Sequence, residues 1–304
     1  MHWKYSLRKV SGRLAEYAFV LPAAVFLTVF IVYPLLYNIM LSVNDIDLSF
    51  FSTREYHFVG LQNYIDLWNA PDGMLKKALL NTLLFTVCSI PLQMIVSFSL
   101  ALFLCENTRI NRVARSTILV AYILPQTITA MVFKLLFLMD GGAINAVLMN
   151  LRLISSPIGF MIKGTTAMLS LVIANVWISM PFSMLIFTAG LGTVDPALGE
   201  AAMMDGAGWW RKLYYITIPS MSETIRIVFT LGFINTFKVF DLVFAMTGGG
   251  PGNATQMLST YSYKLSFGQY TYDMGAVVAN VLFVILLLLG LLYIRSIRKG
   301  SEFS

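Results

Sequence analysis

The chain has 304 residues, of which 58% are hydrophobic and only 12% are charged, and its mean hydropathy is +0.75. Soluble domains carry about 25% charged residues, so this composition excludes a water-soluble fold and predicts a helical, polytopic membrane protein. At about 20 residues per span, about six spans use the whole chain and leave no room for a second, soluble domain. The net charge of +6 does not imply nucleic-acid binding, because basic residues also gather beside membranes.

Six apolar stretches are predicted to be transmembrane helices. They lie near Tyr17–Val43, Leu79–Cys105, Ser116–Met139, Thr165–Leu191, Thr224–Met246 and Met274–Ile294. They form one transmembrane domain, 17–295, after an N-terminal segment, 1–16, and before a tail, 296–304. The tail contains Gly-Ser-Glu-Phe at 300–303, a sequence that cloning sites often leave behind.

Basic residues predict the orientation of the spans. Lys and Arg are more frequent before the first span, after the second, after the fourth and after the sixth than in the opposite connections. Since short cytoplasmic loops are enriched in Lys and Arg, both termini and the loop 192–222 are expected in the cytoplasm.

Several kinds of chemistry have no sequence signal. The only histidines are His2 and His57, and no Cys/His/Asp/Glu group has metal-ligand spacing. The chain has no G-x-x-x-x-G-K-[ST] motif. We therefore expect no metal, no cofactor and no enzymatic activity, and if ATP drives this protein its hydrolysis should lie on another chain.

The loop 192–222 is a polar segment whose sequence carries signals for short helices and a turn. Asp195-Pro196 predicts a helix start, since Asp caps free amides and Pro suits the first helical position. Gly206 and Gly208 allow a turn, and the aromatic run from Trp209 predicts a second short helix. By itself this pattern is also typical of an amphipathic helix at the membrane surface.

The segment Glu200–Pro219 reads EAAMMDGAGWWRKLYYITIP. It resembles the EAA loop of permease subunits of binding-protein-dependent ABC importers, where this loop is a coupling helix that docks in a cleft of the ATPase subunit. The resemblance assigns ATPase coupling to Glu200, Ala201, Ala202, Asp205 and Gly206. A helix of small residues with one carboxylate can lie in a groove and pair with a basic group.

The resemblance extends along most of the chain. The segments VGLQNY (59–64), GAIN (142–145), NVW (175–177), FKVFD (237–241) and TGGGPG (247–252) are similar to the sugar-permease branch, of maltose or glycerol-phosphate type. This implies an all-α, methionine-importer-like type I fold. It also implies a heterodimer with a second related permease, two ATPase subunits, an extracytoplasmic binding protein and a bacterial cytoplasmic membrane whose lipid surrounds the spans.

Polar residues inside predicted spans are candidates for a substrate passage, because such residues usually face protein or water. Asn175, Ser179 and Phe182 follow helical spacing in the fourth span. A second strip in the fifth span contains Gly232, Asn235, Thr236 and Val239.

In maltose-type permeases, the positions that match Asn175, Ile178, Ser179, Phe182, Gly232, Thr236 and Val239 contact the sugar. This chain has fewer amides at the later positions than that pattern. The alternative is interhelical hydrogen bonding, often worth only ~0.6 kcal/mol.

Other interpretations stay open at this stage. Lys238 and Asp241 are spaced to pair on one helix turn, either as a packing ion pair or as a proton relay. The substrate is expected to be a carbohydrate, such as an oligosaccharide, with glycerol phosphate or another polar solute as the alternative. An ion-coupled secondary transporter is the alternative of a different class, although the spans hold few carboxylates.

Overall fold

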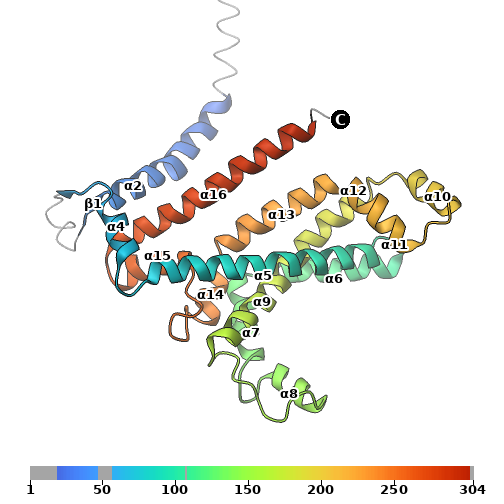
Figure 1. The fold of residues 1–304 in the computed structure, drawn as a ribbon, viewed down its shortest axis with the longest axis horizontal. Coiled ribbons are helices and arrows are strands. Elements are labelled where there is room, and N and C mark those ends of the chain that lie inside the picture. Colours follow the sequence, from blue (N-terminus) through green and yellow to red (C-terminus); the bar gives the residue numbers. More distant parts are fainter. Residues whose placement is uncertain (1–18, 47–56, 107, 302–304) are drawn as a thin grey trace, which may run out of the picture. The chain divides into compact units, whose positions relative to one another are not determined.

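A computed structural model describes residues 19–46, 57–106 and 108–301, which are mostly helical (Figure 1). The chain divides into two compact units, Met1–Asn69 with Ser262–Val281, and Ala70–Tyr261 with Leu282–Ser304.

The first unit begins with a helical stretch, Phe19–Ser42, that includes η1 (Thr28–Val32) and α2 (Tyr33–Ser42). A two-stranded antiparallel pair, β1 (Asn44–Asp45) and β2 (His57–Phe58), precedes α4 (Gln62–Asn69). The chain returns to this unit through the end of α15 (Leu258–Tyr263), η3 (Lys264–Gly268) and the start of α16 (Tyr272–Ser301).

A polar cluster joins three helices of the first unit. The side-chain amide of Asn280 in α16 donates to Ser42 Oγ of α2 at 2.9 Å and to Tyr64 Oη of α4 at 3.1 Å. Its carbonyl accepts from Asn38 Nδ2 of α2 at 2.6 Å. These bonds link α2, α4 and α16 and fix where the three helices meet.

The second unit contains most of the helices. They are α5 (Met74–Phe103), α6 (Arg109–Ile123), α7 (Gln126–Leu136), α8 (Ala143–Asn150), α9 (Gly164–Leu191), α10 (Pro196–Met204), α11 (Trp209–Lys212), η2 (Leu213–Thr217), α12 (Ile218–Ser220), α13 (Ser222–Phe237) and α14 (Asp241–Met246). The long helices α5 and α9 pack against each other along much of their length.

Helix α5 has a polar buried face and an apolar exposed face. Thr82, Thr86, Ser89, Gln93 and Ser97 are buried at helical spacing, whereas leucines and valines on the other side, such as Leu84 and Val87, are exposed. Small and hydroxyl side chains let transmembrane helices approach closely. This distribution suits a helix that packs against protein on one side and faces lipid on the other.

Within the described residues, four helices are long and apolar enough to cross a membrane: Phe19–Ser42, Met74–Phe103, Gly164–Leu191 and Tyr272–Arg295. They correspond to the first, second, fourth and sixth predicted spans. A bent pair, α6 with α7, would be a fifth. A total of six spans therefore stays a prediction.

The third predicted span, Ser116–Met139, is not one continuous helix. Its two halves, α6 and α7, meet at an angle of 99°. Pro125 has no backbone N–H and disfavours helical geometry in the residue before it, and Leu124 is accordingly extended, with ψ at 136°. The apolar pattern continues through this bend and therefore conceals it.

The fifth predicted span, Thr224–Met246, is also interrupted. Helix α13 ends at Phe237 and α14 begins at Asp241. The Val239 carbonyl, which lies in this break, accepts a hydrogen bond from the Ser259 hydroxyl instead of a helical N–H. A distant side chain thus stabilises a break that local sequence does not show.

The break also overturns the predicted pairing of Lys238 with Asp241 on one helix turn. Lys238 caps the end of α13, while Asp241 is the first residue of α14. Asp241 instead lies where a helix N-terminus favours a negative charge.

The polar cluster gives a first prediction. Replacing Asn280 by alanine removes three interhelical hydrogen bonds, each worth ~0.6 kcal/mol in membrane proteins. We expect the free energy of unfolding, measured by denaturant titration of the purified protein in detergent, to fall by about 1–2 kcal/mol. Gly290→Ala is the control on the same helix, because an added Cβ there has no neighbour within 4 Å. An equal loss of stability in both variants would contradict the structural role of the cluster.

Candidate substrate passage and coupling loop

A cavity of about 180 Å³ lies within the second unit, among α5, the α6–α7 bend, α9 and α13. We call it the passage cavity. Its lining residues are Gln93, Tyr122, Gln126, Ile178, Ser179, Phe182, Ser183, Ile186, Val228, Leu231, Gly232 and Asn235. The lining combines amides and hydroxyls with aromatic and aliphatic side chains, and none of the lining residues that the structure describes is charged.

Five of the eight residues that sequence analysis assigned to the passage meet in this cavity. They are Ile178, Ser179 and Phe182 from α9, and Gly232 and Asn235 from α13. Two separate strips of sequence therefore converge on one space.

The other three assigned residues do not line the cavity. Asn175 and Thr236 are buried, and Asn175 Nδ2 lies 3.4 Å from Thr236 Oγ1 in a hydrogen bond between α9 and α13. Val239 belongs to the hydrophobic cluster around Phe85 and Leu171. These three residues hold helices together, as in the alternative interpretation of the polar strips.

Gln93 of α5 is a cavity residue that sequence analysis did not assign. Its side chain is only 2% exposed, and its Nε2 donates to Ser183 Oγ at 2.7 Å. Its Oε1 has no hydrogen-bond partner. If the amide were rotated so that its oxygen and nitrogen changed places, only the atom beside Ser183 would have a partner, and the other would stay unpaired.

An unpaired buried amide atom is costly unless something polar reaches it. The side chain of Gln93 also lies against Gly232, where an added Cβ would be 3.4 Å from Nε2. The glycine thus leaves room for the amide at the wall of the cavity. The signal in the sequence was an amide inside an otherwise apolar span.

The bend between α6 and α7 supplies two more lining residues. Tyr122 comes just before the bend and Gln126 begins α7. The Tyr122 ring stacks on Phe182 with centroids 5.5 Å apart and planes inclined by 15°. Irregular backbone at membrane depth is tolerated where it lines a cavity, which agrees with the place of this bend.

The loop after α9 is built around α10 (Figure 1). As predicted, the helix starts at Asp195-Pro196, and the Asp195 carboxylate accepts from Ala197 N at 2.9 Å. The helix closes with two bonds, from Gly206 N to Met203 O at 3.0 Å and from Ala207 N to Ala202 O at 2.9 Å. This pair of bonds is a Schellman motif, which needs a left-handed residue, and Gly206 has φ +77°.

The residues assigned to coupling lie together on this short helix and at its end. Glu200, Ala201, Asp205 and Gly206 are exposed, and Ala202 is half-buried. Neither carboxylate forms an ion pair with another described residue. Next to them, Trp209, Trp210 and Tyr214 form an exposed aromatic group, with Trp210 stacked on Tyr214 at 6.3 Å.

Comparison with protein-family models matches residues 73–298 to the binding-protein-dependent transport system inner membrane component. Similar proteins include the trehalose/maltose transport system permease protein MalF of Thermococcus litoralis, which is 30% identical over 282 residues and aligned over 92% of each chain. The diacetylchitobiose uptake system permease protein DasB of Streptomyces coelicolor is 29% identical over 96% of this chain and 89% of its own. The lactose transport system permease protein LacF of Rhizobium radiobacter is 29% identical over 92% and 93%.

Solved structures support the same fold. A chain of a bacterial alginate ABC transporter, in complex with an alginate pentasaccharide-bound periplasmic protein, matches with a TM-score of 0.80 at 19% identity, over 97% of this chain and 98% of that chain. A chain of the MetNI methionine ABC transporter matches with a TM-score of 0.56 at 15% identity, over 74% of this chain and 95% of that one. These matches confirm the predicted resemblance and, with the long apolar helices, a multi-pass membrane protein.

The chain therefore belongs to the family of inner membrane components of binding-protein-dependent transport systems, whose members are transport permease subunits and not enzymes.

Proposed function

We propose that this chain is a permease subunit of an ATP-driven importer and passes an uncharged carbohydrate, such as an oligosaccharide, through the passage cavity. The observation that carries this proposal is the neutral lining of the cavity, where Gln93, Ser179 and Asn235 stand beside the stacked rings of Tyr122 and Phe182. Amides and hydroxyls match sugar hydroxyls, and aromatic walls suit the apolar faces of a sugar ring.

The same lining argues against an anionic substrate such as glycerol phosphate. Holding a phosphate away from water requires a cation or many hydrogen-bond donors, and among the described residues no Lys, Arg or His lines this cavity. The names of the relatives, which refer to trehalose/maltose, diacetylchitobiose and lactose, also support a carbohydrate.

The proposed assembly places this chain beside a second related permease, with two ATPase subunits and an extracytoplasmic binding protein. It lies in a bacterial cytoplasmic membrane, with both termini and the loop 192–222 on the cytoplasmic side. The distribution of basic residues and the family match support this arrangement. An ion-coupled mechanism has no comparable support.

In the proposed coupling step, α10 enters a cleft of the ATPase. Its exposed Glu200 pairs there with a basic group, while Ala201 and Ala202 let the helix lie close to the cleft wall. Asp205 and Gly206 end the helix in a turn whose hydrogen bonds are complete within the loop. A helix capped at both ends can transmit a displacement without unravelling.

The passage cavity gives a second prediction, which tests the proposed function. In Ser179→Trp, the indole would fill much of the space of about 180 Å³, so uptake of labelled neutral oligosaccharides should fall to background. Leu185→Trp is the matched control, because Leu185 is exposed on the same helix and does not line the cavity. Membrane levels of both variants should equal those of the wild type. Normal uptake by Ser179→Trp, or wild-type uptake of glycerol phosphate in preference to every neutral sugar, would contradict the proposal.

A third prediction concerns Gln93. If its unpaired amide atom binds the passing sugar, Gln93→Leu should raise the KM for uptake about ten-fold, the effect of losing one hydrogen bond of ~1.4 kcal/mol. Thermal stability should change little, since the variant removes a buried group that is itself only partly satisfied.

Ser89→Ala provides the matched control for this variant. Ser89 lies one turn earlier on the same buried face, also has an unpaired Oγ, and does not line the cavity. A loss of stability in Gln93→Leu with an unchanged KM would assign Gln93 to packing alone.

A fourth prediction concerns coupling. Truncating one member of a buried charged contact costs a few kcal/mol, so Glu200→Ala should reduce uptake and weaken co-purification of the ATPase. Gly206→Val should nearly abolish uptake, because valine strongly disfavours φ +77°. Nothing within the chain lies within 4 Å of an added Cβ there, so any steric obstruction would come from the ATPase.

Gly208→Ala separates these effects from general damage to the loop. Gly208 has φ −68° and open space around an added Cβ, so alanine should be tolerated. If uptake and ATPase retention stayed normal in Gly206→Val, the loop would be only a membrane-surface element.

A further inference from the structure

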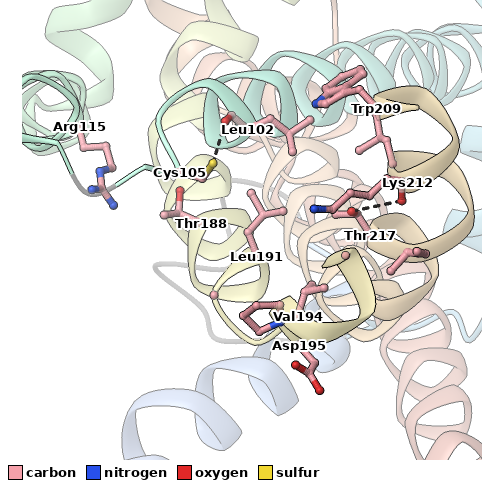
Figure 2. A pocket seen from close by; sticks show the side chains of 15 residues that line it. Leu102, Cys105, Arg115, Thr188, Leu191, Val194, Asp195, Trp209, Lys212 and Thr217 are labelled. Atoms are coloured by element: carbon pink, nitrogen blue, oxygen red, sulfur yellow. Dashed lines mark hydrogen bonds between the residues drawn. The ribbon is translucent and has the colours of Figure 1, made fainter. Parts of the chain in front are cut away.

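A second and larger cavity, of about 450 Å³, lies where α5 and α9 end and the coupling loop begins and returns (Figure 2). We call it the loop-base pocket. It is separate from the passage cavity, with which it shares no lining residue. Neither the family resemblance nor the proposed transport step assigns a function to this pocket.

Two basic residues line this pocket and have no carboxylate partner among the described residues. Lys212 of α11 is half-buried, and its amino group packs so closely against α10 that a Cβ added at Gly199 would collide with it. Arg115 of α6 is also half-buried, and its Nε donates only to the Asn111 carbonyl at 3.4 Å. In Figure 2, Lys212 lies right of the centre, and Arg115 lies at the far left with its guanidinium turned away from Lys212.

The only acidic side chain in the lining does not neutralise these charges. Asp195 accepts the backbone N–H of Ala197 at 2.9 Å as the cap of α10, and it forms no ion pair with Lys212 or Arg115. One carboxylate against two cations leaves an excess positive charge. A half-buried ammonium group without a partner favours an anionic ligand.

The rest of the wall is apolar and aromatic. The apolar lining residues include Leu102 of α5, Leu191 of α9, and Leu213 and Ile216 of η2. Trp209 also lines the pocket. Leu102 and Leu191 lie at the ends of two helices that are long and apolar enough to span a membrane. Tryptophan is enriched at the level of lipid headgroups.

We propose that the loop-base pocket binds an anionic phospholipid, whose phosphate lies at the Lys212 ammonium and whose acyl chain follows the leucine wall. Both a lipid headgroup and free phosphate carry a phosphate group. The apolar wall of the pocket favours a lipid over free phosphate, because an acyl chain can pack against it. The bound lipid would link the ends of α5 and α9 to α11, so that the membrane itself supports the base of the coupling loop. This inference goes beyond the proposed function and does not depend on the substrate.

The test measures lipid retention by native mass spectrometry of the purified transporter in detergent, titrated with phosphatidylglycerol. One cation near an anionic lipid contributes ~1 kcal/mol, so Lys212→Gln should lower the affinity for the tightest-bound phosphatidylglycerol about five-fold, and Lys212→Arg should retain it. Arg211→Gln is the matched control, since Arg211 is the exposed neighbour outside the pocket. Phosphatidylcholine should bind wild type and Lys212→Gln equally.

Three outcomes would overturn the proposal. One is equal retention of phosphatidylglycerol by Lys212→Gln and Arg211→Gln. Another is displacement of the lipid by inorganic phosphate at equal concentration, which would indicate a site for the free anion. The third is loss of the ATPase from Lys212→Gln whatever lipid is present, which would assign Lys212 to the protein interface.

Discussion

The core of a bilayer contains no water that could hydrogen-bond to polar groups. Every polar atom of a spanning helix must find its partner inside the protein, and the helices are arranged accordingly. On α5 the buried face carries hydroxyls and Gln93, while leucines and valines cover the outer face. In the first unit, hydrogen bonds likewise join Asn280 to Ser42 and Tyr64. Hydrophobic burial alone would not choose between helix faces here, because lipid is as apolar as leucine.

Polar groups of the spanning helices that lack a hydrogen-bond partner within the protein are therefore candidates for a function. The α6–α7 bend interrupts a predicted span, and residues on both sides of it line the passage cavity. Gln93 is buried with an unpaired amide atom at the wall of the same cavity. The break after α13 is different, because the Ser259 hydroxyl satisfies the freed Val239 carbonyl. A satisfied break is structural, whereas an unsatisfied polar group beside a cavity is a candidate contact for the substrate.

The sequence predicted the features that depend on composition and local chemistry. Hydropathy located four long helices, and Asp195-Pro196 and Gly206 marked both ends of α10, since capping is decided by single residues. The bend at Pro125 was missed because an apolar pattern cannot distinguish a straight span from a bent one. The break at Lys238–Phe240 depends on Ser259, about twenty residues away. Gln93 was missed because only packing against Ser183 and Gly232 shows that its amide lies at a cavity.

The path of the chain connects the loop 192–222 to the passage cavity. From Trp209 to Phe237 the backbone stays helical through α11, η2, α12 and α13 except at Met221. Met221 is buried, and its N–H bonds to Thr217 O at 3.1 Å, so the connection there is packed and hydrogen-bonded. Helix α11, at the start of this path, follows the turn at Gly206. Helix α13, at its end, contributes Gly232 and Asn235 to the cavity wall. The turn after α10 and the cavity wall are therefore joined by consecutive short and long helices of one stretch of chain.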